Sequence, residues 1–221
     1  MSTNGGWNLA IGASPRATGR FEELVGADGC GEERGQAAED ACWSRRAGAW
    51  IAADPARWIA RAPKKWAHTF DVQAFAVGYL GEADPRTWSP DVRRGWMRAL
   101  SVLQSIIVLV GAWRAVGARV AARRARGLAW AGVAGLGALA IGAGVAWPLV
   151  LVAASVACAT PRAGRGVVAY VGWGIVALAL VRAVFFGEDR YFVPLVPLTC
   201  LLAVARFRGG VRDGALVTSA G

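Results

Sequence analysis

The sequence predicts an all-α protein in which residues 1–97 form a mostly helical external segment and residues 98–221 form a multi-pass transmembrane region of about five spans. Charge is the first observation: residues 98–221 contain 13 Lys/Arg and 3 Asp/Glu, whereas residues 1–97 contain 12 of each. The second is that long uncharged stretches alternate with arginine clusters in the second region. Arginine-rich loops between apolar helices are typical of the cytoplasmic side of a membrane protein. Residues 1–97 are therefore expected on the opposite, outer side.

The uncharged stretches define the expected spans. About 20 apolar residues in a helix cross the roughly 30 Å hydrocarbon layer. The sequence predicts spans at about 97–113, 128–145, 147–160, 167–186 and 191–206. The stretch 128–160 has 33 residues without a charge, and Trp147-Pro148 near its middle is expected to divide it into two short spans. With these spans, the arginine clusters all lie on the cytoplasmic side of the membrane. They comprise Arg114, Arg119, Arg123, Arg124, Arg126, Arg162, Arg165, Arg206, Arg208 and Arg212.

The first 97 residues contain two expected amphipathic helices. One carries a face made of Trp43, Ala47, Trp50 and Ile51. The other begins at Asp54-Pro55, a helix cap followed by proline, has a kink at Pro63, and carries a stripe made of Trp58, Ala62, Trp66 and Phe70. We expect these stripes to pack against each other or to lie among lipid headgroups. Residues 2–34 are rich in Gly, Asn and Ser without either periodicity, which predicts a loop.

Several function classes are disfavoured. A pI near 10.7 suggests nucleic-acid binding. However, the arginines separate uncharged stretches instead of lining a polar face, so no nucleic-acid partner is expected. The chain has one histidine, His68, and no metal-ligand or nucleotide-binding motif, so no metal or cofactor is expected. Cys30 and Cys42 lie in the segment expected outside, where a disulfide is permitted, and the sequence leaves a bridge and free thiols both open.

Three parts of the sequence resemble one family. The stretch Ser2 to Gly19, STNGGWNLAIGASPRATG, resembles a segment in the C-terminal half of bacterial polyprenyl-phosphate-dependent glycosyltransferases. These enzymes belong to the C-type superfamily, with protein mannosyltransferases and aminoarabinose transferases. Two later stretches are similar to that family's motifs in the same order: Ala49-Trp50-Ile51 with Asp54-Pro55 and Lys64-Lys65-Trp66, then Phe185 to Tyr191 with Pro194 and Pro197. Ala13-Ser14 and Phe192 depart from the family, which often has Asn-Asn and a polar residue there.

The resemblance implies sugar transfer from a polyprenyl-phosphate donor to a lipid, glycan or protein acceptor. The reaction would occur at the outer face of the bacterial inner membrane. In this superfamily the catalytic acid lies in the first external loop, and donor-binding residues lie on N-terminal spans that have no counterpart in this sequence. We therefore expect the chain to correspond to the C-terminal part of such an enzyme, with the missing N-terminal membrane half as a further partner. No catalytic residue is predicted.

Substrate-binding residues follow from the charge of the leaving lipid phosphate, which a cation at the membrane surface would stabilise. Arg190 is the first candidate, with Tyr191 orienting it. Lys64 or Lys65 would reach the phosphate from the external helices.

Two alternatives remain open at this stage. Arg190 fits equally well as an interfacial anchor paired with Glu188 or Asp189. The whole chain could also be a non-catalytic multi-pass membrane protein that binds a lipid or a protein partner.

Overall fold

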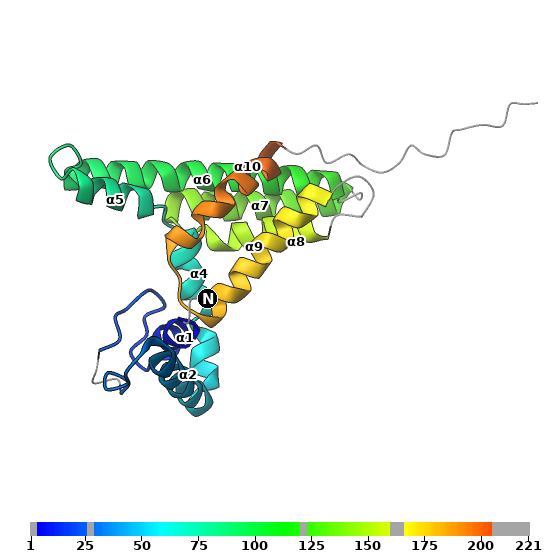
Figure 1. Cartoon of the computed structure of the whole chain (residues 1–221). Helices are drawn as coiled ribbons and strands as arrows, with labels where there is room; N and C mark the ends of the chain where they lie inside the picture. The colour runs from blue at the N-terminus through cyan, green and yellow to red at the C-terminus, as the bar shows by residue number, and fades with distance from the viewer. Residues whose placement is uncertain (1–3, 26–28, 120–122, 160–165, 205–221) are drawn as a thin grey trace, which may run out of the picture.

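The computed structural model describes residues 4–25, 29–119, 123–159 and 166–204. Within these ranges the chain is helical, and its one β-bridge is an isolated parallel pairing of Arg20 with Gly187. The prediction of an all-α fold is confirmed. A lobe made of α1, α2 and α3 lies on one side of a bundle made of α6 to α10, and α4 and α9 connect the two (Figure 1).

The N-terminal lobe contains α1 (Gly5–Ala13), α2 (Gln36–Ala53) and α3 (Pro55–Ala60), and α4 (Ala62–Phe70) follows. The aromatic face predicted on α2 is inward: Trp43 and Ala47 are buried in a small core with α1. The predicted start at Asp54-Pro55 is confirmed, since the Asp54 side chain accepts a hydrogen bond from the Arg57 amide. The second predicted helix is not merely kinked at Pro63: Arg61 separates it into α3 and α4.

The helix α1 corrects the prediction of a loop over residues 2–34. Its sequence shows no apolar face because α1 is covered on more than one side. Its ends are stabilised by distant residues: Asp40 of α2 accepts hydrogen bonds from the first amides, and Arg57 and Arg61 donate to carbonyls just beyond the last turn. A carboxylate at the start of a helix and arginines at its end also complement the helix dipole. This support is tertiary, so the local sequence does not reveal it.

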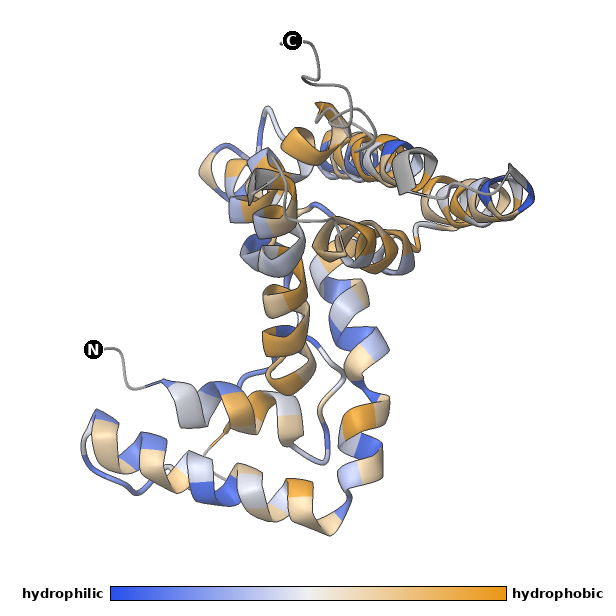
Figure 2. Cartoon of the chain, turned by 90° about the vertical axis from the view of Figure 1, so that its right-hand side faces the viewer, coloured by the Kyte–Doolittle hydropathy of each residue, from blue (hydrophilic) through white to orange (hydrophobic). Residues whose placement is uncertain are grey.

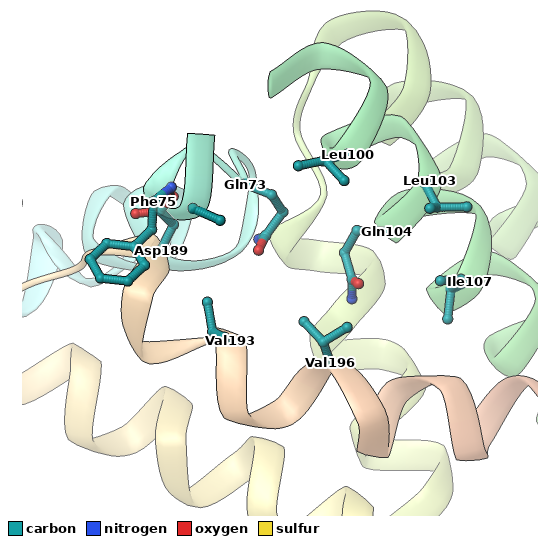
Figure 3. A pocket seen from close by; sticks show the side chains of 10 residues that line it. Gln73, Phe75, Leu100, Leu103, Gln104, Ile107, Asp189, Val193 and Val196 are labelled. Atoms are coloured by element: carbon teal, nitrogen blue, oxygen red, sulfur yellow. Dashed lines mark hydrogen bonds between the residues drawn. The ribbon is translucent and has the colours of Figure 1, made fainter. Parts of the chain in front are cut away.

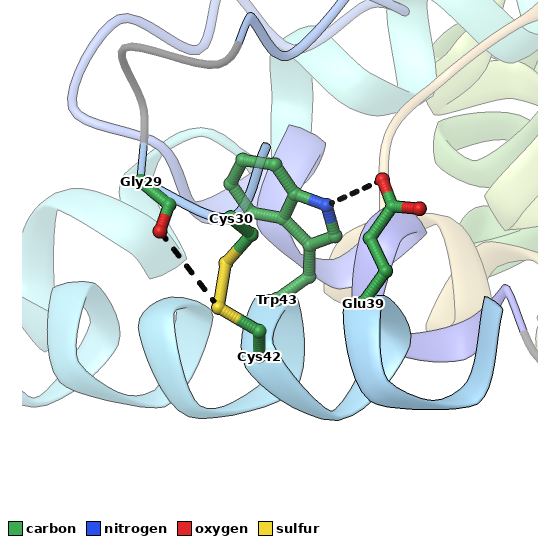
Figure 4. Close-up of a disulfide and its surroundings, with 5 residues drawn as sticks. All are labelled: Gly29, Cys30, Glu39, Cys42 and Trp43. Atoms are coloured by element: carbon green, nitrogen blue, oxygen red, sulfur yellow. Dashed lines mark hydrogen bonds between the residues drawn. A yellow bond between two sulfur atoms is a disulfide. The ribbon is translucent and has the colours of Figure 1, made fainter. Parts of the chain in front are cut away.

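A disulfide joins Cys30 to Cys42, with their Cα atoms 5.9 Å apart. The sequence leaves both a bridge and free thiols open for these two cysteines, and the structure contains the bridge. Cys30 is buried beside Trp43, whose indole N–H donates to the Glu39 carboxylate (Figure 4). The disulfide therefore attaches the segment before α2 to the core of the lobe.

The helix α5 (Phe75–Ala83) precedes the bundle and packs beside its first helix, α6 (Pro90–Arg119). The others are α7 (Arg123–Ala143), α8 (Trp147–Cys158), α9 (Gly166–Val184) and α10 (Val196–Val204), with the short 3-10 helices η2 (Asp189–Tyr191) and η3 (Val193–Leu195) before α10. Each of the five predicted spans overlaps one of the helices α6 to α10. The predicted break at Trp147-Pro148 is present as the start of α8, whereas α5 was not predicted.

Successive bundle helices run in alternating directions. Trp113 near the end of α6 stacks on Trp130 near the start of α7, with ring centroids 5.3 Å apart. The end of α8 similarly lies against Gly172 near the start of α9.

The last helix runs parallel to α6. Gln104 donates to Thr199, and further along both helices Arg114 donates to the Ala203 carbonyl. The helix ends that adjoin the arginine clusters named for residues 114–212 therefore lie at one end of the bundle, whereas Arg93, Arg94 and Arg98 lie at the other end, in the first turns of α6 (Figure 1). Arg162, Arg165 and the three C-terminal arginines lie outside the described residues.

Helix length limits the number of spans. Two helical stretches, Pro90–Val116 and Arg124–Ala143, are long and apolar enough to cross a bilayer. At 1.5 Å per residue, α8, α9 and α10 extend only about 18, 28 and 14 Å against a hydrocarbon layer of about 30 Å. Apolar residues dominate the bundle helices, whereas polar and apolar residues mix in the lobe (Figure 2). By length and composition, the described helices thus include two potential spans, fewer than the five predicted.

Candidate functional site

Three segments that are far apart in the sequence meet at the C-terminal end of α9. The Gly187 amide donates to the Gly19 carbonyl over 2.8 Å. A Cβ placed on Gly187 would lie 1.8 Å from the Lys65 carbonyl oxygen, and one on Gly12 would lie 1.9 Å from that of Phe185. Backbones this close leave room only for glycine. We call this contact of residues 12–20, 64–68 and 182–191 the three-segment junction; each segment contains residues of one of the three motifs found in the sequence.

Lys65 has a structural position in the junction. It is fully buried, and its ammonium donates to the Ala183 and Val184 carbonyls at 2.9 and 3.1 Å. These carbonyls belong to the last turn of α9, whose C-terminal end a cation stabilises. Burial, with a smaller contribution from the charge of Arg61, lowers the pKa of Lys65 to about 8. The predicted contact of Lys65 with a phosphate is therefore replaced by a cap on α9, and Lys64, which is exposed, is the lysine that faces solvent.

Arg190 is exposed and contacts the side chain of Tyr191. Its Nη2 donates to the Tyr191 hydroxyl over 3.3 Å, and its Nε lies 2.8 Å from a carboxylate oxygen of Glu188. The ion pair of the anchor interpretation thus exists with Glu188, while Asp189 instead accepts hydrogen bonds from the Ala74 and Phe75 amides at the start of α5. The other N–H groups of Arg190 have no hydrogen-bond partner among the described residues, and they can bind an anion.

Arg182 is a further cation that was not among the predicted binding residues. Its guanidinium lies 3.7 Å from the centroid of the Tyr191 ring, and its Nη1 donates to the Phe186 carbonyl over 3.4 Å. Its Nε is buried and has no partner within the described part of the chain. Tyr191 therefore contacts two guanidinium groups, those of Arg182 and Arg190. The sequence signal for Arg182 is that it interrupts an otherwise uncharged run.

Positive charge also lies on the other side of Gly187. His68 is half-buried there, and its pKa is lowered by burial and then by the nearby charges of Arg20 and Lys64, so it is neutral at pH 7. Besides the buried Lys65, the junction therefore has two basic groups, Arg20 and Lys64 around His68 and Arg182 and Arg190 around Tyr191. Arg20 could not be found from the sequence, because its partner segment lies more than 160 residues away.

An apolar pocket of about 180 Å³ adjoins the junction (Figure 3). It lies between α5, α6 and the start of α10, and it is lined by Gln73, Phe75, Ala76, Leu100, Leu103, Gln104, Ile107, Asp189, Val193 and Val196. Gln73 Nε2 is buried without a hydrogen-bond partner among the described residues. Asp189 at the edge of the pocket directly precedes Arg190 in the chain.

No protein-family model, curated protein sequence or solved structure matches this chain. The chemistry of the junction therefore rests on its residues alone: several cations, one exposed arginine with unused donors, and a neighbouring apolar pocket. These features fit an anionic group attached to a hydrocarbon chain.

Proposed function

We propose that the chain is a multi-pass protein of the bacterial inner membrane and part of a glycosyltransferase that uses a polyprenyl-phosphate sugar. In this proposal the three-segment junction binds the lipid phosphate. The proposal is supported mainly by Arg182 and Arg190, which both contact Tyr191 beyond the end of α9, with Arg20 and Lys64 around His68 and an apolar pocket bordered by Asp189. The resemblance of the same three segments to such enzymes agrees with this chemistry.

The proposed topology has five crossings, α6 to α10, with the lobe outside and the arginine-rich end inside. Their alternating directions support it, because the helix ends beside the arginine clusters of residues 114–126, 162–165 and 206–212 lie at one end of the bundle. The short α8 and α10 require local thinning of the bilayer or arginines that extend to the headgroups. The Cys30–Cys42 disulfide lies in the lobe, where an oxidising compartment would maintain it.

The phosphate would bind mainly to Arg190. As the glycosidic bond breaks, negative charge grows on the leaving lipid phosphate, and a fixed cation stabilises that charge. A guanidinium can hold two phosphate oxygens at once. In the present ion pair the Arg190 and Glu188 side chains are 40% and 30% exposed, and a phosphate that binds Arg190 Nε would replace the Glu188 carboxylate. The apolar pocket would receive the first part of the lipid chain. No residue of this chain is assigned as the catalytic acid.

Lipid binding tests the proposal. The full chain in lipid nanodiscs should bind a short-chain polyprenyl phosphate more tightly than the matching polyprenol, which lacks the phosphate. Arg190→Ala should weaken phosphate-dependent binding on the order of tenfold, the value of one hydrogen bond to a charged group. Arg190→Lys should recover part of it, because lysine keeps the charge but not the planar fork. Arg86→Ala, which removes an exposed arginine outside the junction, is the matched control.

Equal binding of the polyprenyl phosphate and the polyprenol would contradict a phosphate site and favour the non-catalytic alternative. Wild-type affinity in Arg190→Ala would remove Arg190 from the site.

Topology has a separate test. Single cysteines replace Ser89 or Ser219 in a chain that lacks Cys158 and Cys200 but keeps the disulfide. A membrane-impermeant thiol reagent applied to intact cells should label the cysteine at position 89 and not the one at 219. The opposite pattern would overturn the orientation.

A further inference from the structure

A second pocket, of about 230 Å³, lies in the lobe between the start of α1 and the first turns of α2. It is lined by Asn4, Trp7, Gln36, Glu39, Asp40 and Trp43. It is separate from the three-segment junction, because Gly6 beside the pocket and Gly12 at the junction are six residues, or about 9 Å, apart along α1. The proposed phosphate site does not use any of these residues.

The polar side chains of this pocket are held in place by hydrogen bonds. Asp40 Oδ1 accepts from the Gly6 and Trp7 amides at 2.8 and 3.1 Å. Asn4 Oδ1 accepts from Gln36 Nε2 over 2.9 Å. In each side chain one polar atom makes these hydrogen bonds and the second polar atom makes none. The second atoms are Asp40 Oδ2, the Asn4 amide nitrogen and the Gln36 carbonyl oxygen, which have no hydrogen-bond partner within the described ranges. The pocket therefore presents fixed acceptors and a donor with unused capacity.

Glu39 adds a second carboxylate with the same arrangement. Its Oε1 accepts from the Trp43 indole N–H over 3.4 Å, which leaves Oε2 without a partner among the described residues. Two carboxylates in one small pocket repel a phosphate. They attract groups that donate hydrogen bonds, such as hydroxyls.

Two tryptophans supply the apolar part of the pocket. Trp43 is 2% exposed and forms the inner wall, and its indole is visible between Cys30 and Glu39 in Figure 4. Trp7 is half-buried and is held edge-on against Phe21, with ring centroids 5.7 Å apart. A rigid aromatic side chain offers apolar area to C–H groups at little entropic cost.

We infer that this pocket binds one sugar residue of a glycan. A sugar ring combines C–H groups, which pack on tryptophan, with hydroxyls, which donate to Glu39 and Asp40 and accept from Asn4. A volume of about 230 Å³ is below the roughly 300–1,000 Å³ of pockets for drug-sized ligands and fits a single ring. The alternative of a metal ion is disfavoured, since the described residues contain no group of three or more His, Cys, Asp or Glu suited to one. The inference does not rest on the lipid-phosphate proposal.

Saturation-transfer NMR on the full chain tests this inference. The chain is held in nanodiscs, prepared without any sugar-based detergent, and is titrated with methyl glycosides of common hexoses, an N-acetylhexosamine and a pentose. At least one glycoside should bind saturably. Glu39→Gln and Asn4→Ala change exposed side chains and should each weaken that binding on the order of tenfold. Glu32→Gln, at an exposed glutamate outside the pocket, should leave it unchanged.

Two further measurements separate the explanations. Circular dichroism and the mass of the intact disulfide verify that each variant is folded. Arg190→Ala should keep full sugar binding, so that failure of the phosphate site and failure of this pocket are distinguishable. Absence of saturable binding across the panel would overturn the inference, as would undiminished binding in both pocket variants. A response to calcium that glycosides do not produce would identify a cation site instead.

Discussion

Asp71, between α4 and α5, provides the sharpest test of how this fold is held together. It is only 9% exposed, and its Oδ1 accepts hydrogen bonds from the Ala146 and Trp147 amides, both 2.7 Å long. These amides belong to the start of α8, so a residue 75 positions earlier caps that helix. Burial raises the pKa of Asp71 from 3.8 to about 6, although the two hydrogen bonds oppose the rise.

The shift sets the direction and size of a pH effect. Between pH 3.8 and about 6 the folded protein keeps a proton on Asp71 that the unfolded chain has released, so stability falls as pH rises through this window. A difference of about 2 between the pKa of Asp71 in the folded and unfolded chain corresponds to about 3 kcal/mol in the free energy of unfolding. Asp71→Asn keeps an oxygen acceptor and removes the buried charge. We therefore expect this variant to be more stable than wild type by up to about 3 kcal/mol at pH 7–8, with the difference vanishing near pH 4.

Asp71→Ala separates the charge from the hydrogen bonds. Near pH 4, where the carboxyl is neutral, the alanine variant should still be destabilised, because two buried amides lose their acceptor at a cost of about 1–3 kcal/mol each. Unfolding of the nanodisc-held chain, followed by tryptophan fluorescence from pH 4 to 8, gives the free energies. Glu82→Gln, at an exposed acid in α5, is the control. If Asp71→Asn is less stable than wild type by the same amount at every pH, the ionised carboxylate stabilises α8 through its dipole and our reasoning on burial is refuted.

Three further predictions concern packing, covalent structure and membrane insertion. Gly12→Ala should destabilise the chain by about 1–3 kcal/mol in denaturant unfolding, because its Cβ would lie 1.9 Å from the Phe185 carbonyl oxygen. Gly5→Ala is the control, because a Cβ there would have no atom within 4 Å. Equal destabilisation by the two substitutions would contradict the close contact at Gly12. Cys30→Ser should lower the free energy of unfolding by about 3 kcal/mol and make the lobe susceptible to trypsin. Cys200→Ser, at a free thiol, should leave the digestion pattern unchanged. Ile107→Arg, within α6, should raise the free energy of translocon-mediated insertion by about 2.5–3.5 kcal/mol; unchanged insertion would mean that α6 is not a span.

The sequence by itself determined the helices of the bundle. Uncharged runs bounded by arginines locate α6 to α10, and Trp147-Pro148 locates the break between α7 and α8. These features are local: composition and proline act within a few residues, so they can be recognised without tertiary contacts. The same holds for the start of α3 at Asp54-Pro55 and for the contact between Arg190 and Tyr191, which are neighbours in the chain.

The tertiary structure decided which residues stabilise the helix ends and which are left to bind a ligand. Asp40, Asp71, Asp189 and Lys65 each satisfy the end of a helix far away in the sequence, and no local pattern identifies such a partner. Lys64 and Lys65 illustrate the reason. Consecutive residues of a helix point about 100° apart, so the two lysines had to face different surroundings, but the sequence could not say which one faces inward. The packing of α4 against the end of α9 buries Lys65 and leaves Lys64 in solvent.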